Sequence, residues 1–229
     1  MTRLILGVDV GGTSTAAGAV TSDGDVIGWQ SAPTRGATDP VAMMTTVIAG
    51  VRKAGGYRAD TIEAVGVGVP GPVDAAHGRI GEPVTHVPAL AGRPLGPELR
   101  ERLRLPVFVD NDVNALALGE WMFGAGKGSH SLVVLAVGTG IGAGIVIGGR
   151  VVRGVAGFGG ELGHVPVKFD GPRCFCGGRG CVSVYASGRG IADAARARVA
   201  GNPHAGLVRA PADDPQGITS PLVFRAAAE

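Results

Sequence analysis

Apolar residues recur along the chain in short runs that are separated by turns rich in glycine and proline. Leu4–Val10 is a run of strand type, and strand-like residues lie on both sides of Asp23-Gly24, a dipeptide typical of hairpin turns. Asp39–Gly55 instead carries apolar residues at helical spacing, with Pro40 near its start. This pattern predicts three strands followed by a helix.

The alternation continues through the middle of the chain. Residues 62–74 (IEAVGVGVPGPVD) read as a buried strand that ends in a Gly-Pro loop, and Pro94 to Arg104 as a helix. Residues 106–114 (PVFVDNDVN) contain another short strand, which leads into a further helix. The predicted order, β-β-β-α-β-α-β-α, indicates an α/β protein.

A second unit is expected to begin near Ala115. Its segment LAVGTGIGAGIVI repeats the pattern of the opening segment VDVGGTSTAAGAV, a strand, a glycine turn with a threonine, and another strand. An internal duplication follows from this repeat. We therefore expect an N-terminal lobe over residues 1–114 and a C-terminal lobe over residues 115–229, with a helix from about Ser187 to Ala200.

Composition narrows the classes of function. Glycine accounts for 41 of the 229 residues, well above the usual ~7%, and it clusters in loops where backbone turns sharply or approaches a ligand. A net charge of +2 without a Lys/Arg run gives no case for nucleic acid. Ser131–Gly149 is uncharged, but its glycines disfavour a membrane helix. Because no signal peptide is recognisable, we expect a cytoplasmic protein without membrane contact.

Two turns join strand to strand through glycines and a threonine. Their residues are Gly11, Gly12 and Thr13 in the first turn and Gly138, Thr139 and Gly140 in the second. Turns of this kind point backbone N–H groups into one concavity, which suits a phosphate. Asp9, at the end of the first strand, can position Mg²⁺ directly or through water. The alternative is that both turns are ordinary tight hairpins.

The second turn also fits the dinucleotide fingerprint G-x-G-x-x-A. That fingerprint opens a helix, whereas the glycine-broken, β-branched sequence GIVIGGRVV follows here. The Walker A ending G-K-[ST] is missing too. Both of these nucleotide-binding patterns are therefore disfavoured.

A pair of carboxylates surrounds an asparagine where the strand of residues 106–114 meets its helix. Phosphoryl transfer to an alcohol needs a carboxylate that accepts the hydroxyl proton, and Asp112 can serve. The alternative, which spacing alone leaves open, is that Asp110 or Asp112 caps the helix. Farther along, Glu161 and His164 in GGELGH suit the hydroxyls of a sugar.

All three cysteines of the chain fall in one short loop. Cys174, Cys176 and Cys181 follow His164 in the spacing H-x9-C-x-C-x4-C, and a Cys₃His set makes a closed structural zinc site. Reactive thiols and buried cysteines are the alternatives, and an iron–sulfur cluster would normally use four cysteines. The pattern predicts zinc.

Taken together, these segments resemble the ROK family of sugar kinases and sugar-responsive repressors. The matching segments, in the family's order from about Leu4 to Arg189, are GVDVGGT, GVGVPGPVD, VDNDVNALALGE, AVGTGIGAGIVIGG, GFGGELGH and CFCGGRGCVSVYASG. The resemblance implies an actin-like/hexokinase (ribonuclease H-like) fold of two lobes. It also implies ATP-dependent phosphorylation of a hexose, with glucose ahead of another hexose or an N-acetylated amino sugar.

The resemblance also implies roles for individual residues. The two glycine turns match the family's phosphate motifs, and Asp112 matches its catalytic base. Asn111, Glu161 and His164 match residues that hydrogen-bond the hexose. His164 with the three cysteines matches the family's structural zinc, which would hold His164 in place for the sugar.

Two features depart from the family. Ser183 in GCVS stands where the kinases commonly have a sugar-binding glutamate, so it would reach the same hydroxyl only through a water. The chain stops after ITSPLVFRAAAE, where the family continues into a helix-rich half, so we expect an incomplete second lobe and a homo-oligomer only in a complete protein. An inactive remnant that binds zinc and perhaps sugar is the alternative. No helix-turn-helix precedes Asp9, which disfavours a repressor.

Overall fold

The structure is a computed structural model that describes residues 3–35, 37–201 and 217–228. Its residues cluster into two compact units. The first combines Met1–Val134 with Gly144–Gly160, and the second combines Leu135–Ala143 with Glu161–Glu229. Each unit is described by itself below, and the expected division into lobes after Asn114 stays a prediction.

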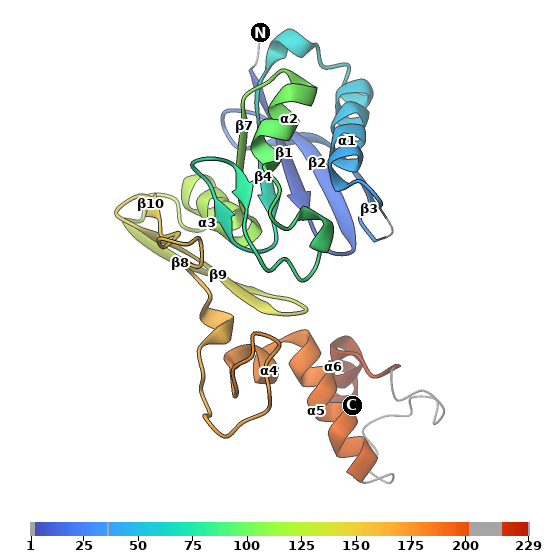
Figure 1. Ribbon diagram of the computed structural model, residues 1–229, viewed down its shortest axis with the longest axis vertical. Coiled ribbons are helices and arrows are strands. Elements are labelled where there is room, and N and C mark those ends of the chain that lie inside the picture. Colours follow the sequence, from blue (N-terminus) through green and yellow to red (C-terminus); the bar gives the residue numbers. More distant parts are fainter. Residues whose placement is uncertain (1–2, 36, 202–216, 229) are drawn as a thin grey trace. The chain divides into compact units, whose positions relative to one another are not determined.

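A five-stranded sheet forms the centre of the first unit (Figure 1). Its strands, in the order β3-β2-β1-β4-β7, are β3 (Val26–Pro33), β2 (Ser14–Val20), β1 (Leu4–Val10), β4 (Ile62–Val69) and β7 (Val107–Asn111). The first three strands are antiparallel, whereas β4 runs parallel to β1 and β7 parallel to β4. The expected hairpin at Asp23-Gly24 is confirmed as the connection between β2 and β3.

Two helices, α1 (Pro40–Gly55) and α2 (Leu95–Leu103), pack together and bury one face of this sheet (Figure 1). The Asp39 carboxylate caps α1 by accepting the N–H of Val41 at 2.9 Å. Gly56 ends the helix with a φ of 62°, which glycine adopts without strain. The helix expected over Asp39–Gly55 is therefore confirmed, and local capping chemistry explains both of its ends.

A third helix, α3 (Asp112–Met122), covers the opposite face of the sheet. The side chains of β4 alternate between the two faces, so Gly68 points away from the core residues Val67 and Val69. A Cβ on Gly68 would lie 3.3 Å from the Cα of Asp112. Glycine at this position lets the first turn of α3 rest directly on the sheet.

A second strand–turn–strand unit is confirmed as β8 (Ser131–Val137) and β9 (Ile141–Ile147), with β10 (Arg150–Val151) pairing to β9. The sequence pattern did not predict the short hairpin of β5 (Val73–Asp74) and β6 (Arg79–Ile80). Single 3₁₀ turns, η1 (Ala59–Thr61) and η2 (Pro88–Leu90), complete the first unit.

The second unit is mostly helical. It contains the 3₁₀ turn η3 (Leu162–His164), α4 (Val182–Ala186), α5 (Gly188–Gly201) and α6 (Ser220–Ala228). The helix expected from about Ser187 is confirmed as α5. No helix in the part of the chain that the structure describes has the length and apolar character to cross a membrane.

Candidate active site

Three positions on neighbouring strands form a row across the sheet of the first unit. Asp9 of β1 stands beside Gly68 of β4, and Gly68 stands beside Asp110 of β7. Residues in register on neighbouring strands point to the same face. The row therefore faces α3, whose first residue, Asp112, lies over Gly68.

The N-cap of α3 is Asn111, not either of the flanking aspartates. Its Oδ1 accepts the backbone N–H groups of Val113 at 3.0 Å and Asn114 at 3.1 Å. Its Nδ2 donates to the carbonyl of Gly71 at 3.2 Å. The second side-chain N–H of Asn111 lies toward the carboxylate of Asp112, where its hydrogen bond lowers the pKa of that carboxyl, and this edge of the amide is the one that a ligand beside Asp112 would meet.

The protein environment makes Asp112 a stronger base than an ordinary aspartate. Burial raises the pKa of its carboxyl, and the nearby charge of Asp9 raises this pKa further. Burial also raises the pKa of Asp9. A desolvated carboxylate with a neighbour of like charge gains more by accepting a proton than an exposed one does.

Gly68 should control the position of Asp112, and its neighbour Gly66 provides a matched control. If Asp112 acts as the base that the sequence predicts, Gly68→Ala should displace it and lower kcat about tenfold, because small misplacements of such a group are costly. Gly66 lies on the same face of β4, but a Cβ there would meet nothing within 4 Å. Gly66→Ala should keep the parent's kcat, and equal rates for both variants would contradict this placement of Asp112.

The first glycine turn is closed on itself and packed from one side. The N–H of Gly11 donates to the carbonyl of Ser14 at 2.9 Å. A Cβ on Gly12 would lie 3.1 Å from the Cβ of His86, so a side chain there would press on that segment. The N–H groups of Gly12 and Thr13 have no hydrogen-bond partner among the described residues, which leaves two donors for an anion.

The second glycine turn is open above its glycines. Gly138 and Gly140 have no left-handed φ, and a Cβ on either would meet nothing within 4 Å. Packing in the described residues therefore does not require glycine there, whereas close approach of a ligand does. The N–H groups of Gly188 and Arg189, at the start of α5, hold the carbonyls of Gly138 and Thr139 at 2.8 and 3.3 Å.

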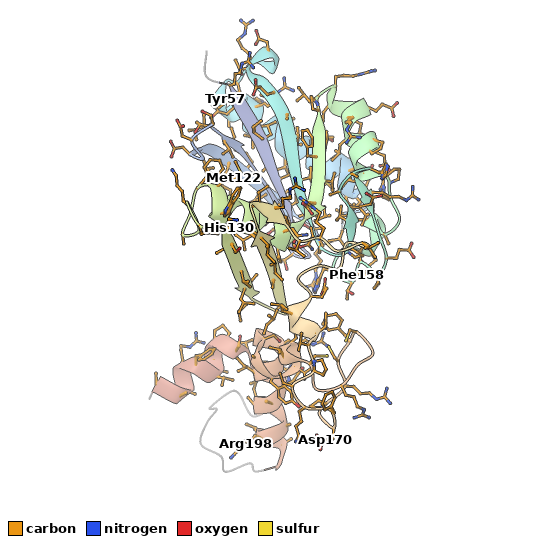
Figure 2. All side chains as sticks on the ribbon, turned by 90° about the vertical axis from the view of Figure 1, so that its left-hand side faces the viewer. Tyr57, Met122, His130, Phe158, Asp170 and Arg198 are labelled. Atoms are coloured by element: carbon orange, nitrogen blue, oxygen red, sulfur yellow. The ribbon has the colours of Figure 1, made fainter. Side chains whose placement is uncertain are left out.

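The predicted zinc ligands come together in the second unit, on the loop that Asp170 marks in Figure 2. The candidate ligand atoms of His164, Cys174, Cys176 and Cys181 all lie within 4.8 Å of one another. The Sγ atoms of Cys176 and Cys181 are 3.8 Å apart. A tetrahedral zinc with Zn–S bonds of ~2.3 Å sets this spacing near ~3.8 Å, so the four residues fit the metal.

The chemistry of the thiols also favours a bound cation. Burial and the two neighbouring thiols raise the pKa of Cys181 to about 12, while the N–H of Gly178 lowers the pKa of Cys176. Three thiols this close cannot all ionise unless a positive charge sits among them. A zinc ion supplies that charge.

The two ring nitrogens of His164 have different neighbours. Its Nδ1 lies 3.5 Å from Cys174 Sγ, its Nε2 lies 3.7 Å from a carboxylate oxygen of Glu161, and its ring packs edge-on against Phe175. One nitrogen can thus bind a metal while the other meets a ligand. Ser183 is only 5% exposed, and its Oγ has no hydrogen-bond partner among the described residues.

The structure therefore gathers the predicted residues into two sets. The first unit brings Asp9, Asn111 and Asp112 together, and the second brings Glu161 and His164 to the cysteine cluster. Sequence reasoning did not single out Gly68, although a glycine inside a strand pattern is a signal of close approach. It also missed Arg153, whose partner Asp110 lies 43 residues away.

A mixed five-stranded sheet, two strand–glycine turn–strand units and a carboxylate at the end of β7 define the actin-like/hexokinase (ribonuclease H-like) fold. The sequence model of the ROK family matches residues 5–223. The chain belongs to the ROK family.

Known relatives include both kinases and repressors. A glucokinase from Streptomyces coelicolor is 39% identical over 202 residues, which cover 87% of this chain and 61% of the relative. A xylose repressor from Bacillus spizizenii is 44% identical over 93 residues, or 41% of this chain and 24% of the repressor. The chain thus spans about three fifths of the length of the curated glucokinase.

Among solved structures, the chain is similar to a ROK family glucokinase from Streptomyces griseus in complex with glucose and AMPPNP. The two share 35% sequence identity with a TM-score of 0.80, over 98% of this chain and 71% of the glucokinase. This likeness and the identity to the S. coelicolor glucokinase support a sugar kinase.

Proposed function

We propose that the protein is an ATP-dependent hexose kinase that converts glucose to glucose 6-phosphate. The observation that carries this proposal is the carboxylate of Asp112, which lies half-buried near the charge of Asp9 and follows the helix-capping Asn111. The identity to glucokinases supports glucose as the substrate. Another hexose or an N-acetylated amino sugar is the alternative within the same chemistry.

In this reaction Asp112 accepts the proton of the sugar hydroxyl while the hydroxyl oxygen bonds to the γ-phosphorus of ATP. The bond from that phosphorus to the bridging oxygen breaks, and ADP leaves with its electron pair. The raised pKa of Asp112 favours the proton transfer. In the first unit the Asn111 side chain would donate to a sugar oxygen, and the resemblance to the ROK kinases assigns further sugar hydroxyls to Glu161 and His164 Nε2 of the second unit.

The two glycine turns would hold the phosphates of ATP. The free N–H groups of Gly12 and Thr13 offer donors in the first turn, and the open space over Gly138 and Gly140, with the Thr139 hydroxyl between them, admits the nucleotide. Asp9 would hold Mg²⁺, directly or through water. When bound, Mg²⁺ neutralises charge on the phosphates.

Zinc would be structural. His164 Nδ1 and the Sγ atoms of the three cysteines would hold it, which leaves no open position for substrate. The ion would fix the imidazole ring so that Nε2 is presented beside Glu161. The protein thus uses its metal to orient a sugar-binding residue.

An assay that couples hexose-dependent ADP release to a dye tests the proposal. The panel holds glucose, fructose, mannose and N-acetylated amino sugars, each with ATP or polyphosphate as donor. We expect the highest kcat/KM with glucose and ATP. A folded, zinc-loaded protein that turns over no hexose would instead be an inactive remnant, and calorimetric titration with glucose then shows whether it binds sugar.

A sugar-responsive regulator is the second candidate, and the match to the xylose repressor is the observation that favours it. A single measurement, ADP release in the presence of sugar, distinguishes the two functions. A regulator binds sugar without releasing ADP, whereas a kinase releases ADP in proportion to sugar phosphate. We place the kinase in the cytoplasm and expect a homo-oligomer in a complete protein, which light scattering of that complete protein tests.

Ser183 offers a direct test of substrate binding. We expect Ser183→Glu to lower the hexose KM roughly tenfold, because one hydrogen bond to a charged group contributes about 1.5–3 kcal/mol. Ser183→Gln is the matched control, with the same length and no charge. If Ser183→Glu leaves the KM unchanged in protein of normal stability, Ser183 does not stand at the sugar.

A further inference from the structure

The carboxylate of Asp110 joins three segments of the first unit. Its Oδ1 accepts the backbone N–H of Asn111 at 2.9 Å and the side-chain amide of Asn114 at 3.3 Å. Its Oδ2 accepts Nε and Nη2 of Arg153 at 2.8 and 2.6 Å. Each carboxylate oxygen therefore accepts two hydrogen bonds, and the Asp110 side chain is only 16% exposed.

Arg153 opens a segment in which two glycines are packed closely against neighbouring backbone, and Phe158 marks it in Figure 2. A Cβ on Gly157 would lie 2.8 Å from the carbonyl oxygen of Val73, and one on Gly159 would lie 2.1 Å from that of Val152. The segment also walls a cavity of about 710 Å³. Arg153 therefore reaches Asp110 from a backbone that is closely packed on both sides.

Asp110 belongs to the row of carboxylates under α3. It stands two strands from Asp9 across Gly68, and Asp112 lies over that glycine. An unpaired Asp110 would add a third negative charge to this row. The guanidinium of Arg153 cancels that charge and, through two donors on one oxygen, fixes how the carboxylate is turned.

We propose that Asp110 and Arg153 are a positioning pair that holds Asn111 in the orientation in which its side-chain amide, beside Asp112, meets the sugar. The inference rests on the proposed function for the identity of the ligand. The pair acts through the backbone N–H of Asn111, which donates a hydrogen bond to the Asp110 carboxylate. Neither residue of the pair touches the substrate itself. It has no counterpart in the residues assigned above from the family resemblance.

The pair should control hexose binding more than the rate of transfer. Arg153→Met raises the hexose KM about tenfold, leaves the ATP KM unchanged and lowers kcat no more than about threefold. Asp110→Asn has the same effect, and the double variant is no worse than either single variant, because both break one interaction. Arg153→Lys recovers part of the loss, since it restores charge but not the two-pronged geometry.

Arg79→Ala is the matched control. Arg79 lines the same cavity and is exposed, but it makes no hydrogen bond to Asp110. Its removal leaves both KM values at those of the parent. A rise in hexose KM with Arg79→Ala equal to that with Arg153→Met would overturn the inference, because loss of any arginine on the cavity would then suffice.

A measurement without substrate separates this inference from the proposed function. In ¹⁵N-labelled protein, Arg153→Met shifts the backbone and side-chain amide signals of Asn111 and speeds their hydrogen exchange, while Arg79→Ala does neither. If the parent turns over no hexose, the proposed kinase fails, and these signals still decide whether the pair positions Asn111. Unchanged Asn111 signals in Arg153→Met, or shifted signals with an unchanged hexose KM in active protein, overturn the inference.

Discussion

Asp112→Asn should lower the rate of phosphoryl transfer by orders of magnitude and stabilise the fold, and these two effects together are the largest that we expect from any single substitution. Loss of the general base lowers kcat by about 10²–10⁴-fold. The asparagine keeps the Oδ1 atom that accepts the N–H of Val113 at 2.9 Å, so α3 retains its start. What disappears is a buried charge beside Asp9.

The gain in stability has a definite dependence on pH. The pKa of Asp112 in the folded protein is raised above its ordinary value of 3.8, so the folded state binds the proton more tightly than the unfolded chain. The cost of the charge therefore appears as pH rises from 3.8 through the raised pKa, and it is complete above that range. Asp112→Asn should raise the unfolding midpoint at pH 7 by about 2–4 °C for each kcal/mol relieved.

Urea and thermal unfolding at pH 7 and pH 5 measure this effect, and the gain should be no larger at pH 5. Asp60→Asn is the control, because hydrogen bonds from Arg58 lower the pKa of that exposed carboxyl and its removal should bring no gain. If Asp112→Asn were less stable than the parent, the charged carboxylate of Asp112 would not be destabilising the folded protein. An Asp112→Asn variant with normal kcat would remove Asp112 as the base.

Loss of zinc should have the second-largest effect, through His164. The purified protein should carry one zinc ion per chain, and Cys176→Ser should lose most of it. Cys176 is exposed, so the serine disturbs little packing. Without the ion, the His164 ring loses the metal bond that orients it and keeps only its edge-on packing against Phe175, so we expect the hexose KM to rise about tenfold.

Metal analysis and steady-state kinetics check this prediction, with Lys168→Ala as the control on the same loop. Lys168 is exposed and lies outside the ligand cluster, so its variant should keep both zinc and KM. Chelation of the parent protein should reproduce the KM of Cys176→Ser. A zinc-free protein with the parent's hexose KM would show that the cluster does not support the sugar site.

Apart from the short β5–β6 hairpin, the main strands and helices of the first unit were predictable because their signals are local. The β2–β3 hairpin follows from Asp23-Gly24, and α1 follows from the capping Asp39, Pro40 and the apolar spacing between them and Gly56. Each signal lies within a few residues of the element that it defines. The order of strands and helices could therefore be predicted from the sequence without knowledge of tertiary contacts.

The sequence predicted which residues belong to much of the candidate site, but it did not predict how they contact one another. Spacing left open whether Asp110 or Asp112 caps α3, and the structure gives that task to Asn111 because its amide oxygen reaches two N–H groups at once. The hydrogen bonds between Asp110 and Arg153 join positions that are 43 residues apart in the sequence, and a local hydrophobic pattern cannot predict such a contact. Such contacts depend on how strands are ordered in the sheet.

The most direct test of the account is ³¹P NMR of the parent protein and Asp112→Asn with glucose, ATP, Mg²⁺ and zinc-loaded enzyme. We predict that the parent converts the γ-phosphorus of ATP into the signal of glucose 6-phosphate, mole for mole with ADP. Asp112→Asn should form neither at a measurable rate while remaining folded. Sugar phosphate formed at equal rates by the two proteins would contradict the account, as would a folded parent that forms none from any hexose.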